Sequence, residues 1–136
     1  MHFLFESIIV GCYLTLIFVV FSFFIENLYI ALFLSGFVKH FLGFYIGLHD
    51  YFCRYGDACQ LEQREQSFFA KRNTEKLLVT SFIEGCIVLG LSYVLCLYVP
   101  TPIFVVFLVG VLMHLFAEYL MIHRDFCINE CGFLKN

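Results

Sequence analysis

Four long apolar stretches set the first limit on what this chain can fold into. They cover residues 7–25, 28–48, 77–99 and 103–122. An α-helix rises 1.5 Å per residue, so about 20 apolar residues cross a hydrocarbon core of about 30 Å. The whole chain has 136 residues, of which 62% are apolar and 14% charged, which is outside the range of a soluble domain. The sequence therefore predicts an all-α integral membrane protein with four spanning helices.

An internal repeat with a period of 74 residues gives the second limit. The segment GFVKHFLGFYIGLHDYFC at 36–53 matches GVLMHLFAEYLMIHRDFC at 110–127, with the shared pattern G-x3-H-x4-Y-x3-H-x2-F-C. The match extends upstream, so that 5–53 aligns with 79–127 and 13 of 49 positions are identical. Four of the five histidines pair with one another in this alignment. Such self-similarity predicts two related structural units.

Each repeat contains two apolar stretches joined by a short turn, Glu26-Asn27 in the first and Pro100-Thr101-Pro102 in the second. This predicts a four-helix bundle made of two helical hairpins. Because each hairpin has an even number of spans, both insert in the same orientation and form a parallel repeat. The predicted parts of this single membrane domain, residues 1–136, are hairpin repeat 1 (1–53), a polar loop (54–76), hairpin repeat 2 (77–127) and a tail (128–136).

The distribution of Lys and Arg predicts the orientation. Outside the predicted spans these residues occur only in the polar loop and after the last span. Cytosolic segments are enriched in Lys and Arg, so we expect the termini and the central loop on the cytosolic side. The N-terminal MHFLFES lacks the basic residues of a secretory signal, and no cleaved signal is expected. The net charge of −3 is too small to indicate a nucleic-acid partner.

Two stripes of small residues, each with a histidine, follow the helical period in the second and fourth spans. Small residues on one helix face allow close approach of helices in lipid, so we predict two helix-packing seams. The alternative interpretation makes His40 and His114 axial ligands of a haem, or a site for a quinone, proton or ion. The glycines favour packing, because a closed seam leaves no room for a macrocycle. The predicted packing residues are Gly36, His40, Gly43, Gly47, Gly110, His114 and Ala117.

Three charged residues lie inside the predicted spans: Lys39, Glu84 and Glu118. A charge at the centre of a spanning helix costs about 2.5–3.5 kcal/mol, so such groups are usually paired or hydrated. The depths of these residues favour pairing of Lys39 with Glu118. We interpret this as a structural salt bridge that orients the second helix against the fourth, with a proton relay as the alternative.

The cysteines fall into two groups. Cys12, Cys86 and Cys96 lie within the spans and are expected to behave as small apolar residues. The other four follow the second and fourth spans in two close pairs, each preceded by a histidine, His49 or His123. Local disulfides, free thiols and a zinc site are all compatible with this spacing. We predict the disulfides Cys53–Cys59 and Cys127–Cys131.

The segments FESIIVG and GFVKHFLGFYIGLHDYFC, with a cysteine close behind, resemble small Phe- and Ile-rich proteins of nucleocytoplasmic large DNA viruses. Proteins of that group reside in the membrane beneath an icosahedral capsid. The resemblance covers mainly the first hairpin and includes no catalytic residue. It implies a structural virion protein that links the membrane to capsid proteins. It also implies that disulfides can form on the cytosolic side, since such viruses carry their own thiol oxidase.

The function predicted from the sequence is therefore a structural or assembly role in a membrane, with no catalytic residue and no cofactor. The expected partners are the lipid bilayer and other membrane or capsid proteins, and homo-oligomerisation is left open. The alternative is a small redox or proton-handling membrane protein. In that case His40 and His114, or the cysteines and histidines that follow the spans, would carry the chemistry.

Overall fold

The computed structural model describes residues 2–48, 51, 67–68, 74–120, 122 and 133–134. Its helices are α1 (His2–Ser22), α2 (Leu28–Tyr45), α5 (Thr74–Cys96) and α6 (Pro102–Tyr119). Two strands, β1 (Ser67–Phe68) and β2 (Phe133–Leu134), pair in an antiparallel manner. All four helices are long and apolar enough to cross a membrane. The predicted helical architecture is confirmed at this level for the described residues.

Local capping fixes where α2 and α6 begin. The Asn27 side chain accepts hydrogen bonds from the backbone N–H groups of Tyr29 (3.0 Å) and Ile30 (3.3 Å). These bonds satisfy amides that have no partner within the first turn of α2. In the second hairpin Pro102 opens α6, and its missing N–H costs no helical hydrogen bond at that position. The short turns predicted from Asn and Pro therefore separate the helices in both hairpins.

Gly47 ends α2. Its φ of +80° lies in the left-handed region, which is accessible to glycine and strained for other residues. This is the usual conformation of the residue that terminates a helix, and α2 accordingly stops at Tyr45. Gly47 therefore does not extend the predicted stripe of small residues. Its neighbour in that stripe, Gly43, is inside the helix and buried.

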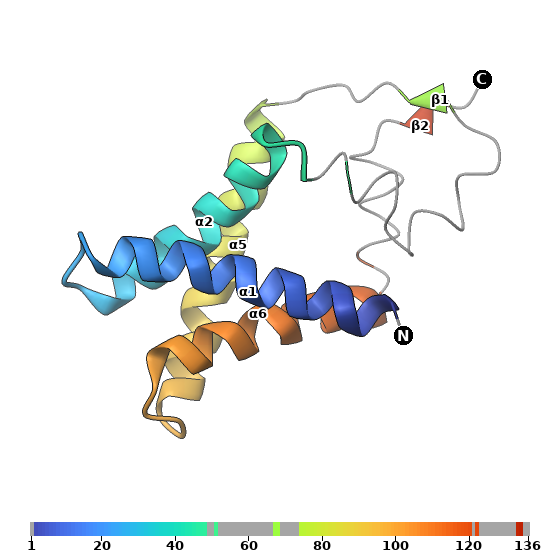
Figure 1. The fold of residues 1–136 in the computed structure, drawn as a ribbon. Coiled ribbons are helices and arrows are strands. Elements are labelled where there is room, and N and C mark those ends of the chain that lie inside the picture. The colour runs from blue at the N-terminus through green and yellow to red at the C-terminus, as the bar shows by residue number, and fades with distance from the viewer. Residues whose placement is uncertain are drawn as a thin grey trace.

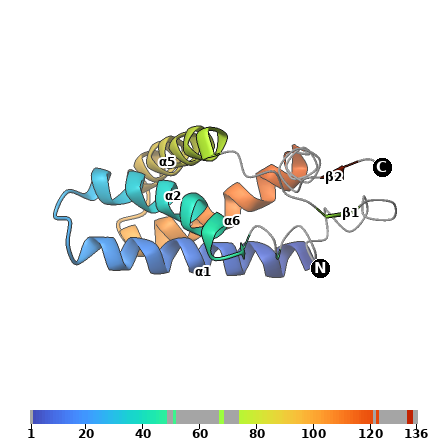
Figure 2. The same cartoon turned by 90° about the horizontal axis from the view of Figure 1, so that it is seen from above.

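The four helices run alternately in opposite directions, with both hairpin turns at the same end of the bundle (Figure 1, Figure 2). The N-terminus of α1 and the last turn of α6 lie at the opposite end (Figure 1). The most extensive packing joins α2 to α5 and α1 to α6, and packing within each hairpin is less extensive. The main helix interfaces thus connect the first hairpin to the second.

Eight pairs of positions 74 residues apart in the chain are buried in both repeats. Equivalent faces of the two repeats are thus turned towards the centre of the bundle. The buried pairs are Ser7 and Ser81, Gly11 and Gly85, Leu14 and Val88, Phe18 and Ser92, Ala31 and Val105, Leu32 and Val106, Ser35 and Val109, and Gly36 and Gly110. Eight of these residues form the central apolar cluster, namely Leu14, Phe18, Ala31, Leu32, Val88, Val105, Val106 and Val109.

The closest contacts between helices occur at glycines. A Cβ atom added to Gly110 would lie 2.7 Å from the Cα of Gly11. At the other interface, a Cβ on Gly36 would lie 2.9 Å from the Cβ of Val88 and 3.0 Å from the backbone oxygen of Glu84. Non-bonded atoms of this kind do not approach so closely, so any side chain at Gly110 or Gly36 would push the helices apart. Glycine therefore sets the distance between helices at both interfaces.

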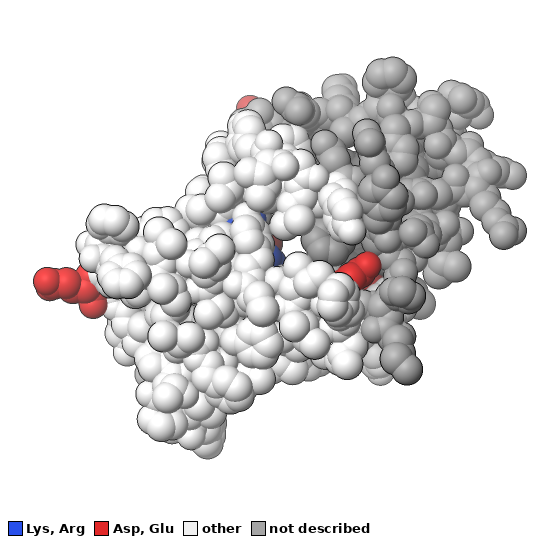
Figure 3. All heavy atoms as spheres, in the orientation of Figure 1, with Lys and Arg blue, Asp and Glu red and all other residues white. Residues whose placement is uncertain are grey.

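The outward faces of the helices are apolar. Large side chains such as Phe24 (83% exposed) and Tyr98 (81% exposed) project from the two turns, and many Leu, Ile, Val and Phe side chains project from the helices. In Figure 3 few atoms of the described residues belong to acidic or basic side chains. A soluble monomer rarely exposes a continuous apolar surface of this extent. Such a surface is suited to contact with lipid.

We expect Gly110→Ala to lower the free energy of unfolding by about 1–3 kcal/mol, because the added methyl group meets the backbone of α1. Gly90→Ala is the matched control, since a Cβ at Gly90 would have nothing within 4 Å. That change should be neutral or stabilising by up to about 1 kcal/mol through helix propensity. Thermal unfolding in detergent, followed by circular dichroism, compares the two. Equal melting temperatures would contradict the described contact.

Candidate functional site

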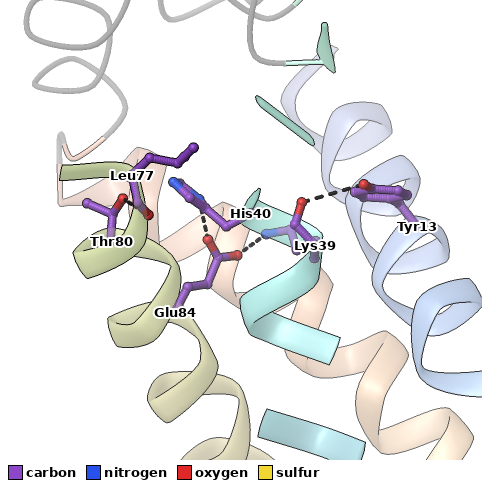
Figure 4. A network of polar contacts seen from close by, with 6 residues as sticks. All are labelled: Tyr13, Lys39, His40, Leu77, Thr80 and Glu84. Atoms are coloured by element: carbon purple, nitrogen blue, oxygen red, sulfur yellow. Dashed lines mark hydrogen bonds and ion pairs between the residues drawn. The ribbon is translucent and has the colours of Figure 1, made fainter. Parts of the chain in front are cut away.

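An ion-paired cluster joins α2 to α5. The consecutive residues Lys39 and His40 of α2 both contact the carboxylate of Glu84 on α5 (Figure 4). Lys39 Nζ forms an ion pair with Glu84 Oε1, and His40 Nδ1 lies 2.6 Å from Glu84 Oε2. The three side chains are 13–19% exposed. Both carboxylate oxygens of Glu84 therefore have a partner from the same neighbouring helix.

The helical geometry explains how two adjacent residues reach one carboxylate. Successive side chains on a helix point about 100° apart, so they can share an acceptor only when it lies between them. Figure 4 shows the Glu84 carboxylate in that position, on the side of α2 that faces α5. The close approach of Gly36 to α5, one turn earlier on α2, brings the two helices near enough for this contact.

The first hairpin supplies a further contact. Tyr13 Oη on α1 donates a hydrogen bond to the backbone oxygen of Lys39 at 3.5 Å, which is at the long end of the range for such bonds (Figure 4). On α5, Thr80 lies one turn before Glu84 and its hydroxyl donates to the backbone oxygen of Leu77 at 3.1 Å. The backbone of Lys39 is thus also linked to α1.

A second contact between histidine and a carboxylate joins α1 to α6. His114 Nε2 lies 3.6 Å from Glu6 Oε2, and His114 is the repeat equivalent of His40. Each repeat histidine therefore contacts a glutamate on the first helix of the other hairpin. The two glutamates are not equivalent in the alignment, because Glu84 aligns with Val10 whereas Glu6 lies one turn before Val10.

The predicted pairing of Lys39 with Glu118 is wrong. Lys39 pairs with Glu84, because the main partner of α2 is α5, and Glu118 lies on α6. The prediction used the depth of each charge, and depth does not say which helix a side chain faces. Glu6 was overlooked because the first span was predicted to begin at Ser7. α1 begins at His2, which places Glu6 inside the helix.

The cluster lies in the half of the bundle that is farther from the hairpin turns. Lys39 is six residues before the end of α2, or about 9 Å along the helix axis. Figure 3 shows basic and acidic atoms set back in a crevice between apolar surfaces, consistent with the partial exposure of these side chains. The helix segments nearer the turns, 14–22, 28–38, 85–96 and 102–113, contain no Asp, Glu, Lys, Arg or His.

The chemistry open to the cluster is limited by its own contacts. Each oxygen of the Glu84 carboxylate is held by one cationic or hydrogen-bonding partner, Oε1 by Lys39 and Oε2 by His40. Its clear role is to neutralise charge that would be costly in lipid, at about 2.5–3.5 kcal/mol for each isolated group. The geometry therefore favours holding two helices together over catalysis.

The residues of the predicted disulfides, and of the zinc site considered as an alternative, lie outside the described residues. This applies to Cys53, Cys59, Cys127 and Cys131, and to His49 and His123. Within the described ranges, no group of three or more His, Cys, Asp and Glu is placed to hold a metal ion. Cys12, Cys86 and Cys96 are free thiols, and the first two are exposed on the outer surface. The disulfides remain a prediction.

A shallow groove lies at the turn end, between α1 and the beginning of α6. It is lined by Cys12, Thr15, Leu16 and Val19 of α1 and by residues from Pro100 to Phe107 on the other side. No charged side chain lines it, and its surface is almost wholly apolar. These properties suit the hydrocarbon chain of a lipid and provide no group for recognition of a polar substrate.

In comparisons with known proteins, no protein-family model, curated protein or solved structure matches this chain. The contacts described above are therefore the basis for assigning a function.

We expect Glu84→Val to destabilise the protein by about 3–5 kcal/mol, because Lys39 and His40 lose their carboxylate. Replacing Lys39 by Met in the same chain should recover most of this loss, since no buried ammonium group is then left without a partner. Glu26→Gln, an exposed change in the first turn, is the control and should be neutral. Thermal unfolding in detergent compares five proteins: the native chain, Glu84→Val, Lys39→Met, the double variant and the control. Additive effects of Glu84→Val and Lys39→Met would contradict a direct pair.

Proposed function

We propose that this chain is a multi-pass integral membrane protein with a structural role, in which two transmembrane hairpins form one rigid unit. The observation that carries the proposal is the position of apolar and charged side chains in the bundle. The outer surface is apolar, whereas Lys39, His40 and Glu84 meet one another between the hairpins. A soluble helical protein would show the opposite arrangement, with charge outside and apolar side chains inside.

The hydroxyl groups of the helices support insertion in lipid. Ser7, Thr15 and Ser35 each donate to the backbone oxygen four residues earlier in the same helix. Such bonds satisfy a hydroxyl without water and without a partner helix. Polar groups in a bilayer need internal partners of this kind, because the hydrocarbon core supplies none.

The proposed arrangement in the membrane is a pair of parallel hairpins related by the internal repeat. Its support is the shared burial of positions 74 residues apart and the location of both turns at one end of the bundle. The one-sided distribution of Lys and Arg favours a cytosolic location for the termini and the segment between the hairpins. These cytosolic segments would then be the surface that binds partner proteins.

The resemblance to small hydrophobic virion proteins extends the proposal to a particular setting, the membrane beneath an icosahedral capsid. There the hairpins would anchor the protein, and the cytosolic segments would contact capsid proteins. Cross-linking of intact particles, followed by mass spectrometry, tests this setting. Cross-links from Lys71 or Lys76 to capsid proteins would support it, and recovery of the protein only from host membranes would contradict it.

A proton-handling protein is the second candidate, because Lys39, His40 and Glu84 form a contact of ionisable groups within the helices. The arrangement does not favour transfer across a membrane. On α2, Lys39 is the charged residue nearest the hairpin turn. The 11 residues from Leu28 to Val38 include no acidic, basic or histidine side chain. That segment is about 16 Å long, which is too far for transfer without further groups or water.

Membrane insertion and orientation can be tested together. We expect the protein to stay in the membrane pellet after carbonate extraction at high pH, because four spanning helices are not released by loss of ionic contacts. In a cysteine-free background, Asn27→Cys and Ser67→Cys should react with an impermeant thiol reagent from opposite sides. Labelling of both from the same side would contradict the proposed topology.

Proteoliposomes test the second candidate. We expect vesicles with the protein to dissipate a pH gradient no faster than empty vesicles. The reason is that the helix segments nearer the turns contain no acidic, basic or histidine side chain to accept a proton. A pH-sensitive dye inside the vesicles reports the rate. Faster dissipation that is lost in Glu84→Gln and kept in Glu26→Gln would favour proton handling over the structural role.

A further inference from the structure

The two hairpins are similar in shape but different in charge. Equivalent faces are buried in both, with Gly11 and Gly85, and Gly36 and Gly110, at matching positions. By shape alone, a hairpin of either kind would fit against its own kind as well as against the other. The charges do not follow the repeat, because Lys39 aligns with Met113 and Glu84 aligns with Val10.

Three pairings of hairpins are therefore allowed by shape, and only one preserves the ion pair. When the first hairpin meets the second, Lys39 faces Glu84, as described here. If two copies of the first hairpin met in the same way, Lys39 would face Val10. If two copies of the second hairpin met, Glu84 would face Met113. Either pairing of like hairpins separates Lys39 from Glu84 in both copies, so two charged groups lose the partner they have in this structure.

We propose that the Lys39–Glu84 pair selects the partner, so that the first hairpin binds a second hairpin and rejects a copy of itself. The partner belongs to the same chain or, when two copies exchange hairpins, to a second copy of this chain. The inference rests on the proposed membrane insertion, because unpaired charge would be tolerated in water.

Cysteine cross-linking in membranes tests this selection with the full-length chain. In a cysteine-free background, Tyr29→Cys and Tyr93→Cys report pairing of unlike hairpins, because these exposed side chains lie side by side across the α2–α5 interface with ring centroids 6.0 Å apart. By the repeat, Val19 is the equivalent of Tyr93, so Tyr29→Cys in one tagged copy and Val19→Cys in another report pairing of two first hairpins. Gly90→Cys, whose position has open space around it, measures random collision.

With the native charges we expect the link between positions 29 and 93, within one chain or between two tags. The link between positions 29 and 19 should stay at the level of the Gly90→Cys control. In the variant Lys39→Met with Glu84→Val, which gives both hairpins the same uncharged residues, the 29–19 link should rise at least about tenfold. A 29–19 link as strong with native charges as in this variant would overturn the proposal, and so would its absence from the variant when the 29–93 link still forms.

A charge exchange keeps the test decisive if the uncharged variant fails to fold. Lys39→Glu alone and Glu84→Lys alone place like charges together and should reduce the 29–93 link at least about tenfold. The double variant restores an opposite pair and should recover the link. Failure to recover would show that charge does not select the partner. Carbonate extraction of the same membranes separates this result from a failure of membrane insertion, since an inserted protein stays in the pellet whatever its pairing.

Discussion

Helices in lipid gain little from hiding apolar side chains from one another, because the surrounding hydrocarbon is equally apolar. Their association depends on close packing and on contacts that lipid cannot provide. In this protein the packing is made possible by glycine: a Cβ atom added to Gly110 would lie only 2.7 Å from the Cα of Gly11. The positions of the polar groups follow from this approach.

The distance between helices decides whether the charges meet. On α2, Gly36 lies against Val88 and the backbone of Glu84, and one turn later Lys39 and His40 reach the carboxylate of the same glutamate. A larger residue at Gly36 would separate the helices and lengthen both contacts. The ion pair in turn neutralises two charges that are partly buried between the helices. Packing and electrostatics therefore support the same interface and favour the same pairing of hairpins.

Much of the fold could be predicted because apolar length and repetition are written directly in the sequence. The four helices were expected, but α1 starts five residues before the predicted span and α2 stops three residues before its predicted end. The length of an apolar stretch does not show where a helix is capped. Gly47, in the left-handed conformation, ends α2 inside such a stretch.

The site was predicted only in part. The sequence identifies Lys39, Glu84 and His40 as unusual residues within spans, and it gives their approximate depths. It does not give the rotation of each helix about its axis, which decides that Lys39 faces Glu84 and not Glu118. A signal was present, since Glu84 immediately precedes Gly85, the repeat equivalent of the seam residue Gly11. A residue next to a seam glycine is near the partner helix.

The most direct test of the account is whether Gly11 and Gly110 touch in a bilayer. Solid-state NMR of the protein in lipid, with glycine labelled by carbon-13, measures this contact without any substitution. The account predicts a cross-peak between the Cα atoms of Gly11 and Gly110. Resolved signals for both glycines with no cross-peak between them would contradict the packing of α1 on α6, and with it the proposed assembly of the two hairpins.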